Sequence, residues 1–248
     1  MLSKNEIKYI QSLGHKKSRD AEGVFLAEGV KIATEFIQTL PGAIVRLYAT
    51  AGFAEKARQK VKPELVTEVT EAELERISQL QTPNQVLIIA RQFPDAELNE
   101  ITNEWILALD TIQDPGNMGT IIRIADWFGI RKIALSEGCA DVCNPKVVQA
   151  SMGSILRIRV KEVDLPGYLS SVQVPVLAAA LGGTDVSDYV FPEAGILVIG
   201  NEGKGISAEV MKHVTQQISI PSFGAAESLN AAVATGILLW ELKRRDKR

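Results

Sequence analysis

The sequence predicts an α/β protein in which a mostly parallel sheet with flanking helices follows a smaller α/β part. In the second half of the chain, apolar runs alternate with turns marked by Gly or Pro, and most runs are followed by a helical segment. The apolar residues in these runs are continuous rather than alternating, which is typical of strands buried on both faces of a parallel sheet. With 248 residues, of which 46% are hydrophobic, the chain can bury the core that this architecture needs.

The first part of the chain predicts a small α/β domain over residues 1–92. A helical start near residues 3–13 is followed by a polar turn, GHKKSRDAEG, and by an apolar strand, VFLAEG. The polar and acidic stretch RQFPDAELNEITNE contains Pro94 and predicts a linker over residues 93–104. Before that linker we also expect helices near residues 30–40, 54–61 and 71–80 and strands near residues 44–49, 65–69 and 86–90.

Residues 105–248 predict the domain that holds the parallel sheet. Ligands of such sheets bind beyond the carboxyl ends of the strands, so the turns at those ends are where a site is expected. The expected strands are WILALD, KIALS, PVLAAAL, GILVIG and QISIP, and the turns of interest are DTIQDPGNMG, LGGTD, GNEGKG and PSFGAAESLN.

The charge distribution favours local rather than general contacts with nucleic acid. The net charge is -3, and nonspecific affinity for nucleic acid depends on phosphate neutralisation by Lys and Arg. Both ends of the chain are basic, whereas all charged residues from Asp95 to Asp114 are acidic. This pattern is compatible with RNA contacts at the basic ends and equally with two solvated faces. No apolar run approaches the roughly 20 residues of a membrane-spanning helix, and the first residues lack a secretory signal pattern, so we expect a cytoplasmic protein.

Cys139 and Cys143 are expected to be free thiols, and no metal site is expected. Their spacing of four residues would suit two ligands on one helical face. However, the only two histidines, His15 and His213, are remote in sequence, so a zinc site would need carboxylates. The same scarcity of histidine disfavours hydrolysis by a Ser-His-Asp triad.

The turn GNEGKG resembles a phosphate-binding loop but does not meet its requirements. A nucleoside-triphosphate loop has the pattern G-x-x-x-x-G-K-[ST], whereas Gly200 is followed closely by Gly203-Lys204-Gly205. The dinucleotide pattern G-x-G-x-x-G is not found at any strand end either. Because Glu202 would repel phosphate, a neutral or positively charged ligand is favoured in this turn.

Arg123 is a candidate site residue in the helix that follows DPGNMG. Asn117 and Gly119 have structural explanations there, as a helix cap and as a point of close backbone approach. Arg123 lies among Ile, Ala, Trp and Phe residues, and a guanidinium on a mostly apolar face usually has an anionic partner. That partner is either an internal carboxylate or a substrate phosphate.

The stretch SIPSFGAAESLNAAVATGILLWELKRR starts with polar residues and continues as an apolar helix. Ser228 can cap this helix, and capping explains much of the pattern. Asn230 is less well explained, because two residues into the helix its side chain presents both a donor and an acceptor to whatever lies there.

Taken together, these turns resemble the SpoU (TrmH-like) family of RNA ribose 2'-O-methyltransferases, within the knotted SPOUT superfamily. The likeness spans roughly Trp105 to Arg245. It is carried by three blocks in order, DPGNMGTIIRIADWFGI, ILVIGNEGKGIS and ISIPSFGAAESLNAAVATGILLWEL, with a weaker fourth, NPKVVQASMGSILRI. The N-terminal stretch GHKKSRDAEGVFLAEGVKIATEFI is similar to the small L30e-like substrate-binding domain found ahead of that catalytic domain.

The resemblance implies a fold, a cofactor and a reaction. The sheet would contain a deep trefoil knot, a rare exception to unknotted topology. S-adenosylmethionine would bind in the knot and donate its methyl group to a ribose 2'-hydroxyl of RNA. Family members are typically homodimers with the knot region at the interface, which would bury the last helix with Trp240. The residues that the resemblance implies are Asn117, Arg123, Glu202, Ser228 and Asn230 for catalysis, Leu181, Gly200, Asn201, Gly203, Ile220, Ser228 and Leu229 for the cofactor, and His15, Lys16, Lys17, Arg19, Arg123, Ser151 and Ser154 for RNA.

The chemistry agrees with this reading in part. Methyl transfer from a sulfonium is an in-line displacement that depends on positioning and needs no metal. Family proposals make Arg123 the acceptor of the hydroxyl proton, but a guanidinium is permanently protonated and is a poor base. We therefore expect Arg123 to bind phosphate and to stabilise the developing oxyanion.

Several alternatives remain open at this point. Ribosomal RNA is favoured over transfer RNA as the substrate, because the N-terminal part resembles a ribosomal-protein fold. The chain could instead be a knotted RNA-binding protein that acts in ribosome assembly without catalysis, although its polar residues match the family at each active-site position. A nucleotide-dependent α/β enzyme is disfavoured by the phosphate-loop spacing.

Overall fold

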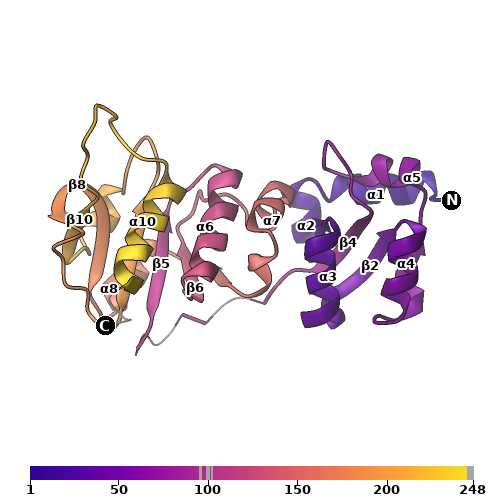
Figure 1. Ribbon diagram of the computed structural model, residues 1–248, viewed down its shortest axis with the longest axis horizontal. Helices are drawn as coiled ribbons and strands as arrows, with labels where there is room; N and C mark the ends of the chain where they lie inside the picture. Colours follow the sequence, from indigo (N-terminus) through magenta and orange to yellow (C-terminus); the bar gives the residue numbers. More distant parts are fainter. Residues whose placement is uncertain (95–96, 99–100, 102, 245–248) are drawn as a thin grey trace. The chain divides into compact units, whose positions relative to one another are not determined.

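The computed structural model describes residues 1–94, 97–98, 101 and 103–244. Part of the expected linker and the basic tail after Arg244 therefore lie outside the described residues. The chain forms two compact units, which we call the first unit, Met1–Pro94 with Asp141–Leu156, and the second unit, Asp95–Ala140 with Arg157–Arg248 (Figure 1). Residues 141–156 differ from the sequence-based division, because they pack with the first unit although they follow the second unit's strands in the chain.

The first unit contains a four-stranded sheet with the strand order β1-β4-β2-β3. Strand β4 runs antiparallel to both β1 and β2, and β3 runs parallel to β2. The strands are β1 (Val24–Glu28), β2 (Ile44–Ala49), β3 (Val66–Glu68) and β4 (Val86–Arg91). The helices are α1 (Lys4–Ser12), α2 (Lys16–Glu22), α3 (Val30–Thr39), α4 (Ala51–Arg58), α5 (Glu71–Ile77) and α7 (Pro145–Ser151), with 3-10 turns at Pro41–Ala43, Pro63–Leu65 and Ser154–Leu156.

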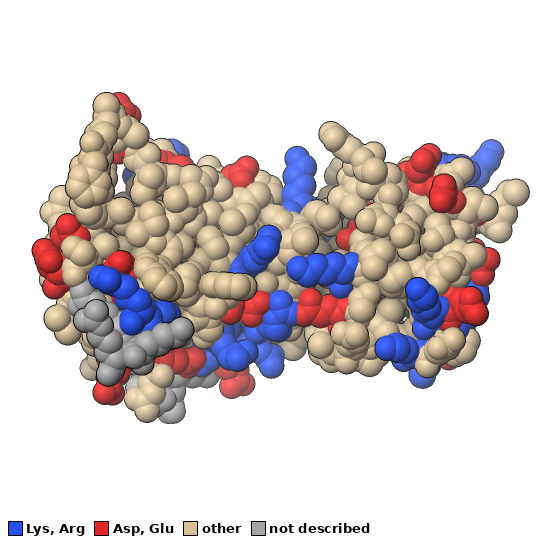
Figure 2. Space-filling view, viewed as in Figure 1, with Lys and Arg blue, Asp and Glu red and all other residues tan. Residues whose placement is uncertain are grey.

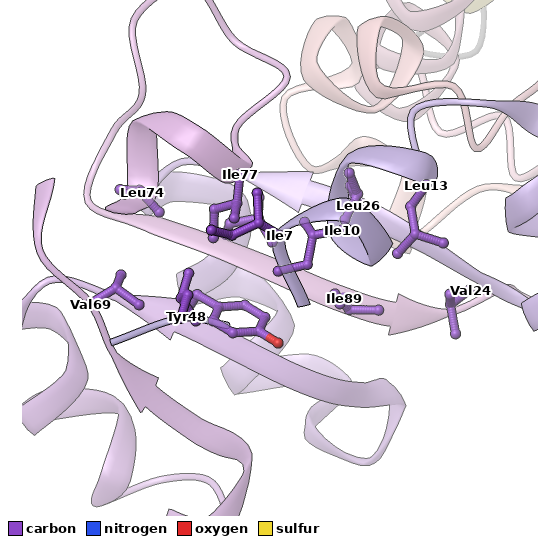
Figure 3. Packing of buried hydrophobic residues seen from close by; sticks show 12 residues of the cluster. Ile7, Ile10, Leu13, Val24, Leu26, Tyr48, Val69, Leu74, Ile77 and Ile89 are labelled. Carbon is purple, nitrogen blue, oxygen red and sulfur yellow. The ribbon is translucent and has the colours of Figure 1, made fainter. Parts of the chain in front are cut away.

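The core of the first unit lies between the sheet and the helices α1 and α5. Ile10 and Ile77 from these helices pack with Leu26 and Ile89 from β1 and β4 (Figure 3). Successive strand residues point to opposite faces, so Phe25 faces the other way and packs on Phe36 of α3. Helices therefore cover both faces of this sheet.

Helix α2 was not expected. The stretch GHKKSRDAEG was predicted as a polar turn, but Lys16–Glu22 forms a helix that ends at Gly23, which has φ 64°. The turn is confined to Gly14 and His15 at its start. The sequence pattern missed this helix because it is short and carries a single buried side chain, Arg19.

The second unit contains a six-stranded sheet with the order β10-β8-β9-β5-β6-β7, and every strand pairing recorded in it is parallel. Helices α6 and α10 pack together on one face, while α8 and α9 contribute to the core on the other face. The strands are β5 (Trp105–Asp110), β6 (Lys132–Leu135), β7 (Arg159–Glu162), β8 (Val176–Asp185), β9 (Gly195–Gly200) and β10 (Gln216–Ser219). The helices are α6 (Pro115–Trp127), α8 (Leu165–Ser171), α9 (Ala208–Met211) and α10 (Ala231–Arg244).

Two strands differ from the sequence prediction. Strand β7 lies at the sheet edge with charged residues, so it lacks the continuous apolar run that marked the others. LGGTD was expected as a turn, but it continues β8, and the register with β10 shifts there. Gly183 is required at that irregularity, because a Cβ on it would lie 2.6 Å from the backbone carbon of Gln217.

The predicted fold class is confirmed: the protein is α/β, and its larger sheet is parallel and flanked by helices. The trefoil knot stays a prediction. Across the described ranges, no helix is long and apolar enough to cross a membrane.

Candidate functional site

Three predicted catalytic side chains from distant parts of the chain meet in the second unit. Asn117 lies in the first turn of α6, Glu202 lies in the loop after β9, and Asn230 immediately precedes α10. The Asn117 amide Nδ2 donates to Glu202 Oε1. The Asn230 amide Nδ2 donates to Asn117 Oδ1 over 2.9 Å. These two bonds form a chain of polar groups at the carboxyl-terminal edge of the parallel sheet, where ligands of such sheets bind.

The capping of α6 leaves the Asn117 side chain available to bind Glu202 and Asn230. Capping was the structural alternative for Asn117 in the sequence, but Asp114 is the cap: its Oδ1 accepts a hydrogen bond from Asn117 N over 2.8 Å. Pro115 occupies the first helical position, where its missing N–H causes no loss. The Asp-Pro pair was the sequence signal for this cap.

Asn230 has two functions at the start of α10. Its Oδ1 accepts from Ala232 N over 2.9 Å and from Val233 N over 3.2 Å, so it caps the helix, while its Nδ2 binds Asn117. The helix begins at Ala231, so Ser228 is not the cap that the sequence indicated. Residues 221–230 are all exposed, and the loop that carries them is a largely uncharged projection in Figure 2.

The loop that carries Glu202 is held by its neighbours. Asn201 Nδ2 donates to Thr111 O over 2.9 Å, and Asn201 Oδ1 accepts from the N–H groups of Gly203 and Lys204. A Cβ on Gly200 would overlap the backbone of Gly205, so the loop folds back tightly onto the end of β9. Gly200 and Asn201 thus shape the loop, and Glu202 is left half-buried with its carboxylate toward Asn117.

Three of the residues predicted for the cofactor lie in or directly after adjacent strands. Leu181 belongs to β8, Gly200 ends β9 and Ile220 follows β10, and these three strands are neighbours in the sheet. Leu181 is 76% exposed and Leu229 is 45% exposed, although both are large and apolar. Open apolar side chains and a carboxylate on the same domain fit a ligand with an apolar ring and a positive charge, and S-adenosylmethionine has both.

Arg123 is exposed on α6, in contrast to the apolar surroundings that the sequence indicated. Within the described residues its guanidinium has no hydrogen-bonding or ion-pairing partner, so an internal carboxylate does not hold it. Two large apolar side chains lie open on the same pair of helices: Trp127 of α6 is 84% exposed and Trp240 of α10 is 56% exposed. A surface with two open indoles is unusual for a single protein chain.

A cavity of about 540 Å³ opens elsewhere in the second unit. It lies at the carboxyl ends of β5, β6 and β7, and four of its lining residues are acidic, namely Asp110, Glu137, Glu162 and Asp164. None of the predicted catalytic residues lines it. Its negative lining would repel RNA phosphates, so we do not place the substrate there.

The predicted RNA-binding residues fall into two groups. His15, Lys16 and Lys17 are exposed at the start of α2, and Lys16 Nζ pairs with Asp20 at 3.0 Å. Arg19 is only 1% exposed, and its guanidinium binds Asp141 and the carbonyl oxygens of Leu13 and Gly14. A guanidinium enclosed in this way cannot reach RNA, so the prediction for Arg19 requires correction: its role is to hold the turn in place.

Ser151 and Ser154 also require correction. Both are buried in the first unit, and Ser151 Oγ donates to Val148 O over 2.7 Å. A hydroxyl that is buried within its own helix has no access to a substrate. The interior position follows from the packing of α7 against β1.

The two cysteines are free thiols. Burial and the nearby Asp141 carboxylate raise the pKa of Cys143 to about 12, and burial raises the pKa of Cys139. In the described part of the chain, no group of three or more His, Cys, Asp or Glu residues could hold a metal ion.

Comparison with known families decides which class of protein carries this site. Residues 104–240 match the family described as the SpoU rRNA Methylase family. The chain belongs to this family. Residues 4–88 also match the MRM3-like substrate binding domain, so the resemblance inferred from the sequence blocks is confirmed.

Individual SpoU relatives share almost the whole chain. The 23S rRNA (guanosine(2553)-2'-O)-methyltransferase RlmP of Bacillus subtilis is 31% identical, over 97% of this chain and 97% of its own. The AdoMet-bound rRNA methyltransferase structure from Sinorhizobium meliloti superposes with a TM-score of 0.88 and 32% identity, covering 99% of this chain and 97% of that one. The structure of the SpoU methyltransferase AviRb from Streptomyces viridochromogenes, in complex with AdoMet, superposes with a TM-score of 0.85 and 26% sequence identity, and 99% of each chain is covered.

Proposed function

We propose that this protein transfers the methyl group of S-adenosylmethionine to a ribose 2'-hydroxyl of ribosomal RNA. The observation that carries the proposal is the pair of side-chain hydrogen bonds that links Asn230 to Asn117 and Asn117 to Glu202. These residues lie at the ligand-binding edge of the second unit's sheet, in a chain that belongs to the SpoU family. Two of the relatives named above are described as rRNA methyltransferases, one of them specific for 23S rRNA, which favours ribosomal over transfer RNA. An enzyme of this kind would act in the cytoplasm on ribosomal RNA.

The cofactor would be held by residues in or directly after β8, β9 and β10. Leu181 and Leu229 would contact its apolar ring, and Gly200, Asn201, Gly203 and Ile220 would offer backbone groups, with Ser228 at the entrance. When bound, S-adenosylmethionine supplies a methyl carbon activated by a positively charged sulfur. The Glu202 carboxylate favours that charge, and the two asparagines fix the direction in which Glu202 points. The main contribution of the protein is therefore alignment of the ribose hydroxyl with the methyl carbon.

Arg123 would bind a phosphate of the substrate. Its guanidinium is exposed, is permanently charged and has no partner among the described residues, so it is available to an anion. Charge that develops on the 2'-oxygen would be stabilised by the same group. Replacing Arg123 with Lys and measuring methylation against pH tests this role: a largely retained rate with an unshifted pH profile rules out Arg123 as the base that accepts the proton.

The active form would be a homodimer formed through α6 and α10. Trp127, Val233 and Trp240 are exposed on these helices, and a partner that covered them would remove three large apolar side chains from water. Arg123 lies one turn before Trp127 on α6, so the partner would also border the site. A Trp240→Arg variant should be monomeric in sizing coupled to light scattering and should lose activity, whereas a monomeric wild-type protein would contradict the proposal.

The decisive experiment maps 2'-O-methyl groups in total RNA from cells with and without this protein. We expect one ribosomal RNA mark to disappear in its absence and to return with wild-type protein, but not with Asn117→Asp. If the mark that disappears lies in transfer RNA instead, the substrate is transfer RNA and the proposal of ribosomal RNA is wrong. Calorimetry with S-adenosylmethionine addresses the alternative of an assembly factor without catalysis, because a protein with no measurable binding would not be the enzyme.

A further inference from the structure

A buried carboxyl group lies beside the loop that carries Glu202. Asp110 ends β5, where it pairs with Gly200 of β9, and it is only 3% exposed. Within the described residues it makes no ion pair, so hydrogen bonds alone stabilise its oxygens. Oδ2 accepts from Ser207 N over 2.7 Å, and Oδ1 accepts from the Thr111 hydroxyl over 3.0 Å. A buried carboxyl group without a cation, at the edge of the sheet where the site lies, breaks the usual rules of a core and indicates a function.

The bond to Ser207 holds the far end of that loop, residues 201–207, which we call the Glu202 loop. The loop closes on itself, because Asn201 and Gly205 exchange backbone hydrogen bonds of 3.0 and 2.9 Å, and it leads into α9 at Ser207. Asp110 and Ser207 both line the cavity of about 540 Å³ described above. Since that side of the loop is open, packing does not fix its end there, and the hydrogen bond does.

The bond to Thr111 acts on the near end of the Glu202 loop. Thr111 has φ 59°, in the left-handed region that a β-branched residue rarely adopts. Its hydroxyl is held by Asp110, and its N–H donates to Ser136 Oγ over 2.9 Å. The Thr111 carbonyl oxygen is thereby directed at Asn201, whose Nδ2 donates to it over 2.9 Å. Strain that is maintained by several bonds beside a site indicates that the site uses this geometry.

We propose that Asp110 is a positioning residue for methyl transfer, which fixes Glu202 by holding both ends of the Glu202 loop. One of its oxygens binds Ser207 directly, and the other acts through Thr111 on the first residue of the loop. Glu202 lies between these two points, and its carboxylate accepts from Asn117. A shift of the loop by about 1 Å would weaken that bond and misplace the carboxylate. The inference rests on the proposed function, because it concerns how the acidic group of that site is oriented.

The first test measures trypsin cleavage after Lys204 in the full-length protein without any ligand, with the fragments identified by mass spectrometry. Lys204 is exposed in the Glu202 loop, and cleavage there requires the loop to open locally. Because each hydrogen bond changes such an equilibrium about fivefold, Asp110→Ala should be cleaved roughly tenfold faster at this site. Cleavage after Lys60, which is exposed in the first unit, should not change.

Asp185→Ala is the matched control. The Asp185 carboxylate accepts from the N–H and the hydroxyl of Ser187, both over 2.8 Å, so the variant loses the same kinds of bond elsewhere in the second unit. Its Glu202 loop should be cleaved at the wild-type rate. Equal cleavage of Asp110→Ala and this control would overturn the inference.

Two further variants separate hydrogen bonding from charge and from misfolding. Asp110→Asn should stay close to the wild-type rate, because an amide accepts from Ser207 N through its oxygen and donates to the Thr111 hydroxyl through its nitrogen. If Asp110→Asn behaved like Asp110→Ala, the negative charge would matter and not the bonds, and the inference would be wrong. Ser207→Pro removes a single bond at φ -62°, which proline adopts, so it should raise cleavage about fivefold even if Asp110→Ala does not fold.

The second test measures the affinities for S-adenosylmethionine and S-adenosylhomocysteine by calorimetry. Asp110→Ala should weaken binding of the former by several fold, and by no more than the roughly tenfold expected for Glu202→Gln, because only the former carries a positive sulfur. Binding of the latter should not change. The double variant Asp110→Ala/Glu202→Gln should bind like Glu202→Gln alone, since residues that act through one another are not additive.

The calorimetric outcomes distinguish the inference from the proposed function. Losses that add in the double variant, or equal losses for both ligands, would show that Asp110 does not act through Glu202. A wild-type protein that binds S-adenosylmethionine no more tightly than Asp110→Ala does refutes the inference alone. A wild-type protein that binds neither ligand refutes the proposed function, and the cleavage test then still decides whether Asp110 holds the loop.

Discussion

Asn230 allows its two functions to be separated by substitution. In Asn230→Ala, α10 loses a cap, which costs about 1 kcal/mol, and Asn117 loses a hydrogen bond of about 1 kcal/mol or less because the pair is exposed. A total of about 1.5 kcal/mol lowers the melting temperature of a chain of this size by about 5 °C. Methyl transfer should also fall, because Asn117 is no longer oriented toward Glu202.

Asn230→Asp is the matched variant that keeps one function only. Aspartate caps helices as well as asparagine does, so the melting temperature should stay within about 2 °C of the wild-type value. A carboxylate cannot donate to Asn117 Oδ1, and it adds a second negative charge close to Glu202. We therefore expect the methylation rate to fall at least roughly tenfold, which corresponds to about 1.4 kcal/mol of transition-state stabilisation.

The assays are thermal unfolding and single-turnover methylation of ribosomal RNA with radiolabelled cofactor. If Asn230→Asp methylated at the wild-type rate, the bond to Asn117 would have no catalytic role and capping would explain the residue. If Asn230→Ala melted at the wild-type temperature, the capping contribution worked out above would be wrong.

Three further predictions concern charge and burial. Glu202→Gln should weaken S-adenosylmethionine binding roughly tenfold while leaving S-adenosylhomocysteine unaffected in calorimetry, because only the former carries a positive sulfur; equal losses for both would contradict the electrostatic role. Since the pKa of Cys143 is raised to about 12, iodoacetamide at pH 8.5 should label the folded protein at Cys143 roughly a thousandfold more slowly than the protein unfolded in urea. The unfolded state then loses the thiol proton at a lower pH than the folded state does. The contribution of Cys143 to the free energy of unfolding should therefore be complete below about pH 8.5 and decline toward pH 12. Asp141→Asn should lower the free energy of unfolding by about 3 kcal/mol in urea titrations, because it leaves the Arg19 guanidinium buried without its counter-charge, whereas Asp20→Asn at the exposed Lys16 pair should change it little.

Much of the fold could be predicted because its strands carry strong local signals. The runs WILALD and GILVIG form β5 and β9, which are buried throughout or nearly so. A strand whose side chains are apolar on both faces is stable only in a sheet that is covered on both faces. The signal failed where the structure depends on neighbours: β7 is a charged edge strand that forms only because β6 lies beside it. LGGTD became strand for the same reason, through pairing with β10.

The candidate site was predictable in its residues and not in its bonds. Ordered sequence blocks marked Asn117, Glu202 and Asn230, because a family's polar residues remain recognisable in the sequence. Which of them caps a helix depends on where that helix begins, and the sequence placed both starts incorrectly. Arg123 was marked as a site residue, but its exposure and its lack of a partner in the described part of the chain emerged only from the packing of α6.

The sequence by itself determined the class of the protein, the parallel sheet and the identity of the polar groups that meet at the sheet's edge. Local patterns of apolar runs and turns indicate each of these three features. The tertiary structure alone decided what those groups can reach. It buried Arg19 against Asp141, 122 residues away, and brought the Gln79 side chain against the turn at Gly14. Contacts of this kind join segments that are far apart in the chain, so no local pattern records them. Burial decides whether a charged side chain is open to a ligand or supports the fold.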